Sequence, residues 1–495
     1  MPPASLLFPE FRLRTATLAL SAVVLAGCMS LAPAPNTPPL PAPKVWPSHL
    51  ESSTDGAHAG ELAWQAYFTD PLLQRLIETA LENNRDLRLA ALRVEEASAA
   101  FRIQRSDRFP AVGVGAQGGR ARVPGDLNMS GRSHVGGEYR AEVGLSTWEL
   151  DLWGRVRNLE DAALQTWLAT DAARRAVHLA LIAQVADGYL GLREIDERVA
   201  IARKTVTTRE ESYRIFRRRV EVGSTSTLDL TQVQTLLNQA QALLTQLEQA
   251  RATQLHALAL LVGADPGSLP AKALFDETTV LAELRAGLPS ELLVSRPDII
   301  SAEHQLRAGD ANIGAARAAF LPRIALTGSF GTASSDLNGL FDSGSRAWTF
   351  MPTLSMPFFD DGRLRANLEL SEVRRDIAVA GYEKTIQTAF REVADALSAK
   401  YWLAEQLTIQ GANLETQSER ARLAQLRYDN GSAAFLEVLD AQRDLLGAQQ
   451  QLVQARRALL SSQVALYAAL GGGTLAASNE VDGATSTPAS IPSTR

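Results

Sequence analysis

The residues that could catalyse a reaction or bind a metal ion are few and scattered along the chain. Its 495 residues include one cysteine, Cys28, and six histidines, and no histidine lies in an HExxH pair or beside the cysteine. The sequence has neither a nucleophile elbow nor a phosphate-binding loop. We therefore predict that the protein is not an enzyme and has no metal site and no cofactor.

One nucleotide-binding pattern occurs, but in the wrong context. The segment 113–118, GVGAQG, fits the GxGxxG fingerprint. That fingerprint binds a dinucleotide only where it follows a strand and opens a helix. Here the glycines lie inside a segment with a period of two, which indicates a strand. We interpret them as small residues on one face of a sheet.

The charge of the chain argues against a nucleic-acid partner. The formal net charge is −6, whereas phosphates require clustered Lys and Arg. The only tight basic run is 217–219, which is typical of a solvated helix face. We expect no nucleic acid among the partners.

The amino terminus carries a predicted modification site. Arg12 and Arg14 precede an apolar run that is too short to span a bilayer and that ends in LAGC (25–28). This pattern resembles a bacterial lipoprotein signal with its lipobox. The resemblance implies cleavage before Cys28, acylation of that cysteine and, because Met29 follows rather than an aspartate, sorting to the outer membrane. The alternative is an ordinary secretory signal followed by a buried free cysteine.

Between its two ends the sequence repeats itself. The separation is about 208–212 residues, which indicates two copies of one large unit. Four pairs of segments match: 84–87 with 296–299, 108–110 with 320–322, 154–157 with 362–365, and 219–224 with 427–432. Each half is therefore predicted to contain a helix, two strands, a very long helix, a turn and another long helix.

The long helices are predicted from the absence of helix breakers. No proline occurs between 155 and 265 or between 363 and 470, and only Gly223 and Gly431 lie where a turn is needed. The helices after the turns have apolar residues at alternating spacings of three and four, which favours a coiled-coil seam over a simple amphipathic helix. The seam residues are Leu230, Val233, Leu237, Ala240, Leu244 and Leu247 in the first half and Val438, Ala441, Leu445, Ala448, Leu452, Ala455 and Leu459 in the second.

Four segments alternate apolar with polar or glycine residues: 110–118, 139–147, 324–332 and 348–358. Strands of this length and pattern are the signature of a transmembrane barrel, although a soluble sandwich shows a similar alternation. The barrel is favoured because only four strands occur beside long helices. Trp148 breaks the alternation of its strand, which indicates a bulge. The loops 119–136 and 333–346 are the predicted turns between the strands.

The number of strands predicts an oligomer. Open sheet edges are not tolerated in hydrocarbon, so four strands per chain must be completed by other chains. Two copies give eight strands, whose interior is filled by side chains, and three copies give twelve strands with room for a passage. The predicted fold class is an α+β membrane protein: a homotrimer in which a long α-helical barrel is continuous with a transmembrane β-barrel, with a two-fold internal repeat.

Together these features resemble the TolC-type outer-membrane factor family, in its OprM/NodT-like lipoprotein branch. The resemblance covers about residues 45–470 and includes the segments RYDNGS (427–432) and LEVLDA (436–441). It implies a lipid-anchored outer-membrane channel that exports small molecules from the periplasm, with a periplasmic adaptor and an inner-membrane pump as partners. A type I protein-secretion channel and a periplasmic coiled-coil scaffold lipoprotein are the alternatives.

Acidic residues just beyond the two turns are the candidate periplasmic gate. Asp229 follows Gly223 by six residues, and Glu437 and Asp440 follow Gly431 by six and nine. The resemblance implies that such carboxylates narrow the mouth of the tunnel and form acidic rings, which attract cations. The alternative is local, because the first of these acids also fits a capping box at a helix start.

The segment boundaries follow from these features. We predict a signal peptide over 1–27, a lipid-anchored proline-rich tether over 28–70, a first repeat over 71–262, a connector over 263–295, a second repeat over 296–470 and a disordered tail over 471–495. Six prolines within 31–43 indicate an extended tether, and the Gly, Ser, Thr and Pro residues after 470 indicate disorder.

Overall fold

The computed structural model describes residues 30–34, 57–127, 129–265, 284–285 and 291–474. The chain divides into two compact units. The sheet unit comprises 1–39, 93–170 and 301–382, and the hairpin unit comprises 40–92, 171–300 and 383–495. None of the described helices is both long enough and apolar enough to cross a membrane.

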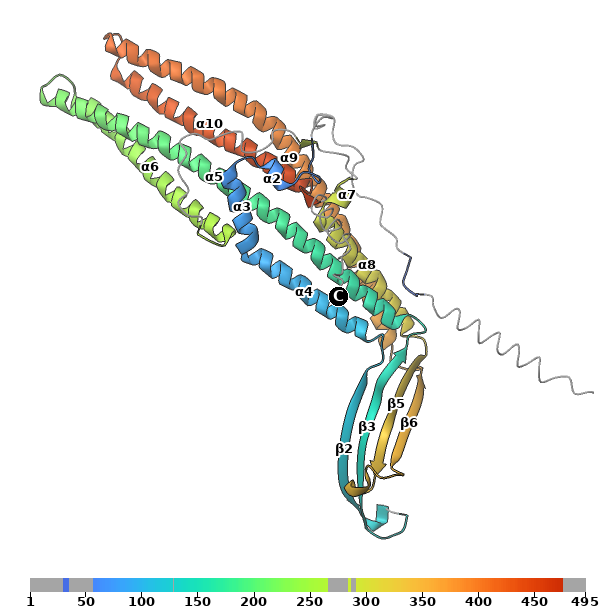
Figure 1. Cartoon of the computed structure of the whole chain (residues 1–495). Coiled ribbons are helices and arrows are strands. Elements are labelled where there is room, and N and C mark those ends of the chain that lie inside the picture. Colours follow the sequence, from blue (N-terminus) through green and yellow to red (C-terminus); the bar gives the residue numbers. More distant parts are fainter. Residues whose placement is uncertain (1–29, 35–56, 128, 266–283, 286–290, 475–495) are drawn as a thin grey trace, which may run out of the picture. The chain divides into compact units, whose positions relative to one another are not determined.

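The order of elements is the same in the two halves of the chain, as the repeat predicts (Figure 1). The first half contains α4 (Arg85–Ser106), β2 (Val112–Val123), β3 (His134–Leu150), α5 (Arg155–Glu221) and α6 (Thr227–Val262). The second half contains α8 (Pro297–Ala318), β5 (Arg323–Ser334), β6 (Arg346–Ser355), α9 (Arg363–Asp429) and α10 (Phe435–Ala469). The shorter elements are β1 (Ala57–His58), α2 (Trp64–Tyr67), α3 (Pro71–Asn83), η2 (Gly125–Leu127), β4 (Leu284–Arg285), α7 (Leu292–Ser295) and η5 (Leu337–Gly339).

The two long helices, α5 and α9, begin in a similar way in both halves. Gly154 and Gly362 precede them with φ of 73° and 80°, a left-handed conformation that glycine adopts without strain. A nearby aspartate then accepts from the first free N–H groups of each helix. Asp151 accepts from the amide of Arg157 at 2.8 Å, and Asp360 accepts from that of Leu364 at 2.9 Å. The repeat therefore preserves a sharp strand-to-helix turn.

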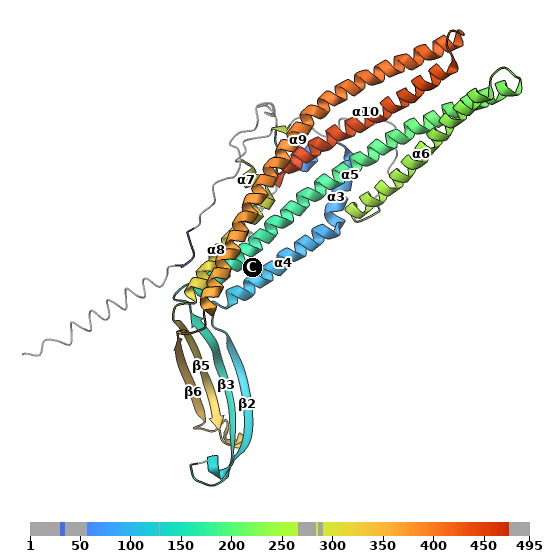
Figure 2. The ribbon, with the colours of Figure 1, turned by 180° about the vertical axis from the view of Figure 1, so that it is seen from behind.

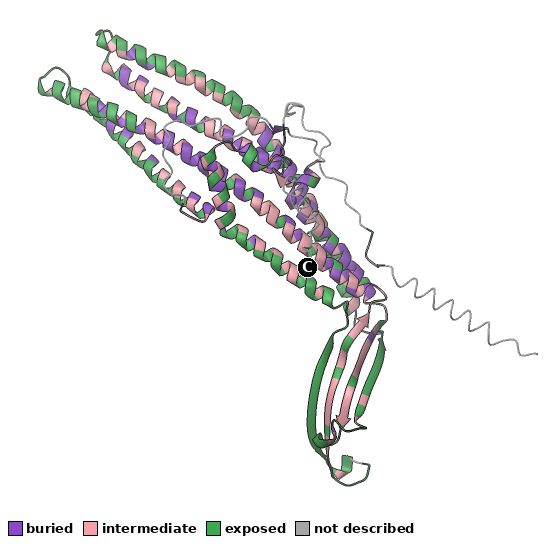
Figure 3. Cartoon of the chain, viewed as in Figure 1, coloured by how far each residue is buried: buried purple, intermediate pink, exposed green. Residues whose placement is uncertain are grey.

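The four long strands form one antiparallel sheet in the order β2-β3-β5-β6. Its register aligns Val114, Val143, Phe330 and Trp348 in one row across all four strands. These side chains are 86%, 50%, 65% and 72% exposed. The neighbouring row, on the other face, is Gly113, Gly144, Ser329 and Thr349, and its last two hydroxyls are 2.9 Å apart. The sheet thus has one apolar and one polar face, and β2 is exposed along its whole length (Figure 3).

Two details of the sheet differ from the predicted strands, and one agrees. Pairing of β2 with β3 continues as far as Val123 and His134, so the first loop is shorter than 119–136, because its glycines and arginines belong to the ladder. β6 ends at Ser355, since Pro357 has no N–H to continue it. The predicted bulge is confirmed: the register of β3 against β5 shifts between Leu145 and Trp148.

An ion cluster joins the strands to the helices within the sheet unit. The side chain of Glu149, at the end of β3, is only 9% exposed. Its carboxylate accepts from Nε and Nη2 of Arg155 at 2.9 and 2.7 Å, and Nε of Arg323 lies 2.6 Å from it. The cluster ties the start of α5 and the start of β5 to one buried carboxylate, and removing either arginine leaves that charge poorly compensated.

The hairpin unit is held together by the predicted seams. In both views α6 lies along α5 and α10 lies along α9 (Figure 1, Figure 2). Leu237, Ala240 and Leu247 of α6 are buried against α5, where they contact Val206, Ala202 and their neighbours. In the second hairpin, Val438 and Ala441 pack on Ala421 and Ala424. The coiled-coil seam is confirmed, and small residues at these positions let the helices approach closely.

A charged residue interrupts the first seam. Arg209 continues the spacing of Val206 and Tyr213 on α5, is only 3% exposed, and has no ion pair or hydrogen bond with any described residue. Burial lowers its pKa. An unpaired cation in an apolar seam destabilises the hairpin, since its desolvation is not offset by a counter-charge.

We therefore predict that Arg209→Met stabilises the protein by roughly 1–3 kcal/mol, because an apolar side chain of similar length fills the same space without a charge. Thermal unfolding in detergent, followed by circular dichroism, measures the change. Arg203→Met is the control, because Arg203 is 64% exposed and pairs with Glu248, and we expect it to be nearly neutral. A lower midpoint for Arg209→Met would contradict the prediction.

Candidate functional site

The two turns of the hairpin unit share one backbone geometry. Gly223 and Gly431 have φ of 76° and 71°. In each turn the residue after the glycine donates to a carbonyl five residues back: Ser224 to Arg219 at 2.8 Å, and Ser432 to Arg427 at 2.9 Å. An added Cβ would meet nothing within 4 Å at either glycine, so glycine is required by its conformation and not by lack of space.

The first acidic candidate, Asp229, belongs to a complete capping box. Its amide donates to the Ser226 hydroxyl at 3.1 Å, and its carboxylate accepts from the Ser226 amide at 3.2 Å. The hydroxyls of Ser226 and Thr225 donate to the same carboxylate at 2.7 and 2.8 Å. These hydrogen bonds, the one from Ser226 first, lower the pKa of Asp229. The cap is therefore present, and it leaves the negative charge of Asp229 without a cation among the described residues.

The two acidic candidates of the second turn are ion-paired instead. The N-cap residue of α10 is Ala434, whose methyl side chain cannot accept a hydrogen bond. Glu437 instead forms an ion pair with Arg427 across the turn. Asp440 lies 3.3 Å from Arg443, one helical turn along α10. The two turns thus have the same backbone and different side-chain chemistry.

An aromatic cluster joins the two hairpins close to these turns. The rings of Phe216 and Phe435 are 4.3 Å apart, and Tyr428 lies 4.9 Å from Phe435. The guanidinium of Arg219 stacks over Phe216 and Tyr428 at 5.4 and 5.9 Å and donates to the Tyr428 hydroxyl. All three arginines of the basic run are exposed, as predicted, and Arg219 differs from Arg217 and Arg218 in also stacking on aromatic rings. Only the match between 219–224 and 427–432 could have indicated a special role for it.

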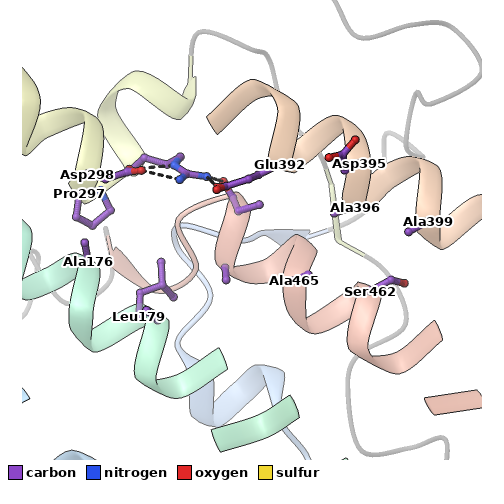
Figure 4. Close-up of a pocket in the computed structure, with 14 residues that line it drawn as sticks. Ala176, Leu179, Pro297, Asp298, Glu392, Asp395, Ala396, Ala399, Ser462 and Ala465 are labelled. Atoms are coloured by element: carbon purple, nitrogen blue, oxygen red, sulfur yellow. Dashed lines mark hydrogen bonds and ion pairs between the residues drawn. The ribbon is translucent and has the colours of Figure 1, made fainter. Parts of the chain in front are cut away.

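A cavity of about 630 Å³ lies elsewhere in the hairpin unit, between α5, α9, α10 and the start of α8 (Figure 4). Seven of its fourteen lining residues are alanines, and Arg296 also lines it. Arg296 binds Asp298 at 2.6 Å, Glu392 at 2.8 Å and the carbonyl of Ala469 at 3.0 Å. Burial opposes its charge, yet the two carboxylates raise the pKa of Arg296. It therefore acts as a clamp that joins α8 and α9 to the end of α10.

The remaining predicted site residues differ in what the structure says of them. Cys28 lies outside the described residues. Across the described part of the chain, no group of three or more His, Cys, Asp or Glu side chains is close enough to hold a metal ion. The chemistry of the described residues is thus that of charged turns, helical seams and a two-faced sheet.

The sequence profile described as outer membrane efflux protein matches residues 76–264 and 288–472. Because that match covers most of the chain, the protein belongs to the outer membrane efflux protein family. The resemblance stated from the sequence is confirmed.

Relatives agree with this assignment over nearly their whole length. The probable efflux pump outer membrane protein TtgC of Pseudomonas putida is 44% identical over 460 residues, 92% of this chain and 95% of the relative. The outer membrane protein OprJ of Pseudomonas aeruginosa is 42% identical over 93% of this chain and 97% of its own length. The open state of the Neisseria gonorrhoeae MtrE outer membrane channel superposes with a TM-score of 0.82 at 35% identity, covering 90% of this chain and 99% of that one. The protein is an outer-membrane efflux protein.

The capping box yields a prediction about the first turn. Asp229→Ala removes a cap and should destabilise the start of α6 by about 1 kcal/mol, seen as faster hydrogen exchange in the first turn of that helix. Because the pKa of Asp229 is lowered, its stabilising effect is complete above the ordinary pKa of aspartate and is lost as pH falls through the lowered value. The difference in thermal midpoint between wild type and variant should therefore shrink in acid. Glu437→Ala, which removes no cap, is the control, and equal exchange effects in both variants would contradict the prediction.

Proposed function

We propose that three copies of this chain form one channel, in which the four-stranded sheets close into a twelve-stranded transmembrane barrel. The apolar row of Val114, Val143, Phe330 and Trp348 supports this, because side chains that are half or more exposed on one face of a sheet match a lipid-facing surface. The edge strands β2 and β6 support it as well, since sheet edges in hydrocarbon must be paired. The polar row would then line the passage.

The hairpins supply the proposed periplasmic tunnel and its gate. In a trimer, Asp229, Glu437 and Asp440 each occur three times around the axis, beside turns whose glycines, Gly223 and Gly431, allow a tight reversal. Crowded carboxylates at a narrow mouth favour cations. The three carboxylates differ in how far their charge is neutralised. Glu437 and Asp440 are paired with arginines, whereas Asp229 is only hydrogen-bonded. We therefore propose Asp229 as the main source of the negative potential.

Partners and anchoring complete the proposal. Several relatives are named as outer membrane proteins of efflux pumps, which supports a tripartite system with a periplasmic adaptor and an inner-membrane pump. We propose that Cys28 is acylated, that the chain is held in the outer membrane by both lipid and barrel, and that it has no catalytic activity. We also propose the segment boundaries predicted from the sequence, with the two repeats over 71–262 and 296–470.

The first test is the number of subunits. Native mass spectrometry in detergent should give a trimer, because three sheets of four strands close into a twelve-stranded barrel with an open lumen, whereas two sheets give eight strands whose interior is filled. A stable monomer or dimer would exclude the proposed barrel. Denaturing mass spectrometry of the same sample should show an amino-terminal peptide that begins at an acylated Cys28.

The second test is the ion selectivity of the mouth. In single-channel recordings Asp229→Asn should reduce the preference for cations by a factor of roughly two or more, and the combined Ala variant of Asp229, Glu437 and Asp440 should reduce it further. Arg427→Gln should raise the preference, because it exposes the charge of Glu437. Unchanged selectivity in all variants, with only a loss of stability, would leave Asp229 as a cap alone.

A further inference from the structure

The residues that directly follow the predicted acylation site are bound to the sheet unit. The Ser30 hydroxyl donates to Oδ1 of Asn158 at 2.7 Å, and it accepts from the amide of Ala32 at 3.2 Å. One residue further, the carbonyl of Leu31 accepts from Arg317 at 3.3 Å. Asn158 is only 1% exposed, so the segment is held by a buried amide of α5 and by a guanidinium of α8.

A glycine of α8 makes room for this segment. A Cβ placed on Gly314 would lie 2.8 Å from the amide nitrogen and 2.9 Å from the Cα of Ala32, and 2.6 Å from Nδ2 of Asn158. Backbone atoms at these distances cannot move aside cheaply. Glycine within a helix costs up to about 1 kcal/mol relative to alanine, so its presence here needs a packing reason, and the close approach of Ala32 supplies one.

The other copy of the repeat has no such seat. The position equivalent to Gly314 is Arg102, and the position equivalent to Asn158 is Ala366. A long side chain would fill the space and a methyl group would offer no hydrogen bond. Of the two copies of the repeat, only the one that the amino-terminal segment contacts therefore has both the glycine and the asparagine.

The residues of the seat are also close in sequence to the ends of β3 and β5. Asn158 lies in the first turn of α5, directly after the turn that follows β3, and Gly314 lies in the last turns of α8, just before β5. Cys28 precedes Ser30 by two residues, which span at most about 7 Å. Acyl chains on Cys28 would therefore be attached next to the ends of the strands.

We propose that Asn158, Gly314 and Arg317 form a seat for residues 30–32, which holds the acylated amino terminus at a fixed place beside the barrel. The inference rests on the proposed acylation of Cys28 and adds a binding surface for the anchor. The lipid would then be attached within a few residues of a fixed point on the sheet unit. The occupant of the seat is this chain's own amino-terminal segment.

Disulfide trapping tests the seat. In the acylated protein the only natural cysteine is blocked, so the pair Ser30→Cys and Asn158→Cys should cross-link on mild oxidation, which peptide mapping detects as a link between the two segments. The matched control pairs Ser30→Cys with Ala163→Cys, which lies five residues further along α5 and about 140° around it. A rate no faster than the control would overturn the seat.

Two glycines of α8 provide matched backgrounds for the trapping pair. Gly314→Ala should slow cross-linking about tenfold, because the methyl group displaces Ala32. Gly309→Ala should leave it unchanged, since a Cβ there meets Arg375 only at 3.4–3.6 Å. Equal rates in the two backgrounds would contradict the proposal.

The mass of the amino-terminal peptide separates the two hypotheses. An acylated peptide without trapping rejects the seat and keeps the anchor. Trapping in a protein whose natural Cys28 proves to carry no acyl group keeps the seat as a peptide-binding surface and rejects its role in holding the lipid.

Discussion

The apolar face of the sheet is the constraint on which the rest of the structure depends. Val114, Val143, Phe330 and Trp348 expose half or more of their surface. Burying apolar surface is worth roughly 25 cal/mol per Å², so leaving such a row in water is unfavourable. The chain has only four long strands, and their outer edges are open. The proposed lipid surface on one face and further copies of the sheet at both edges would relieve these costs together.

The helices must then accommodate a sheet whose strands all end at a common boundary. Sharp turns at Gly154 and Gly362 return the chain directly into α5 and α9, and the buried Glu149 binds Arg155 and Arg323 at the same boundary. Long helices without a globular core need lateral partners, which the small-residue seams of α6 and α10 provide.

The order of elements could be predicted because it depends on periodicity and on helix breakers. Gly223 and Gly431 can be recognised as turn residues because they lie within proline-free stretches. Trp148 indicates the bulge because it breaks the alternation of apolar and polar residues in its strand. Strand ends were less accurate, because the glycines of β2 suit a loop as well as a ladder. The contacts between the hairpins were not predictable, since nothing local distinguishes the stacked Arg219 from the solvated Arg218. The seat for residues 30–32 was missed for the same reason: it joins segments far apart in sequence.

The two copies of the repeat share the residues that fix the backbone and differ in the side chains that carry charge. Where the backbone needs a left-handed turn, both copies keep glycine. Where a side chain acts, they diverge: the first turn is capped by Asp229 and the second is bridged by Glu437 and Arg427. Arg209 interrupts the first seam, and its equivalent in the second is Gln417. Since each chain contributes both kinds of hairpin, a closed ring of three chains contains six turns of two alternating kinds. In the proposed trimer, the unpaired charge of Asp229 would then dominate the potential of the mouth, because Glu437 is neutralised by Arg427.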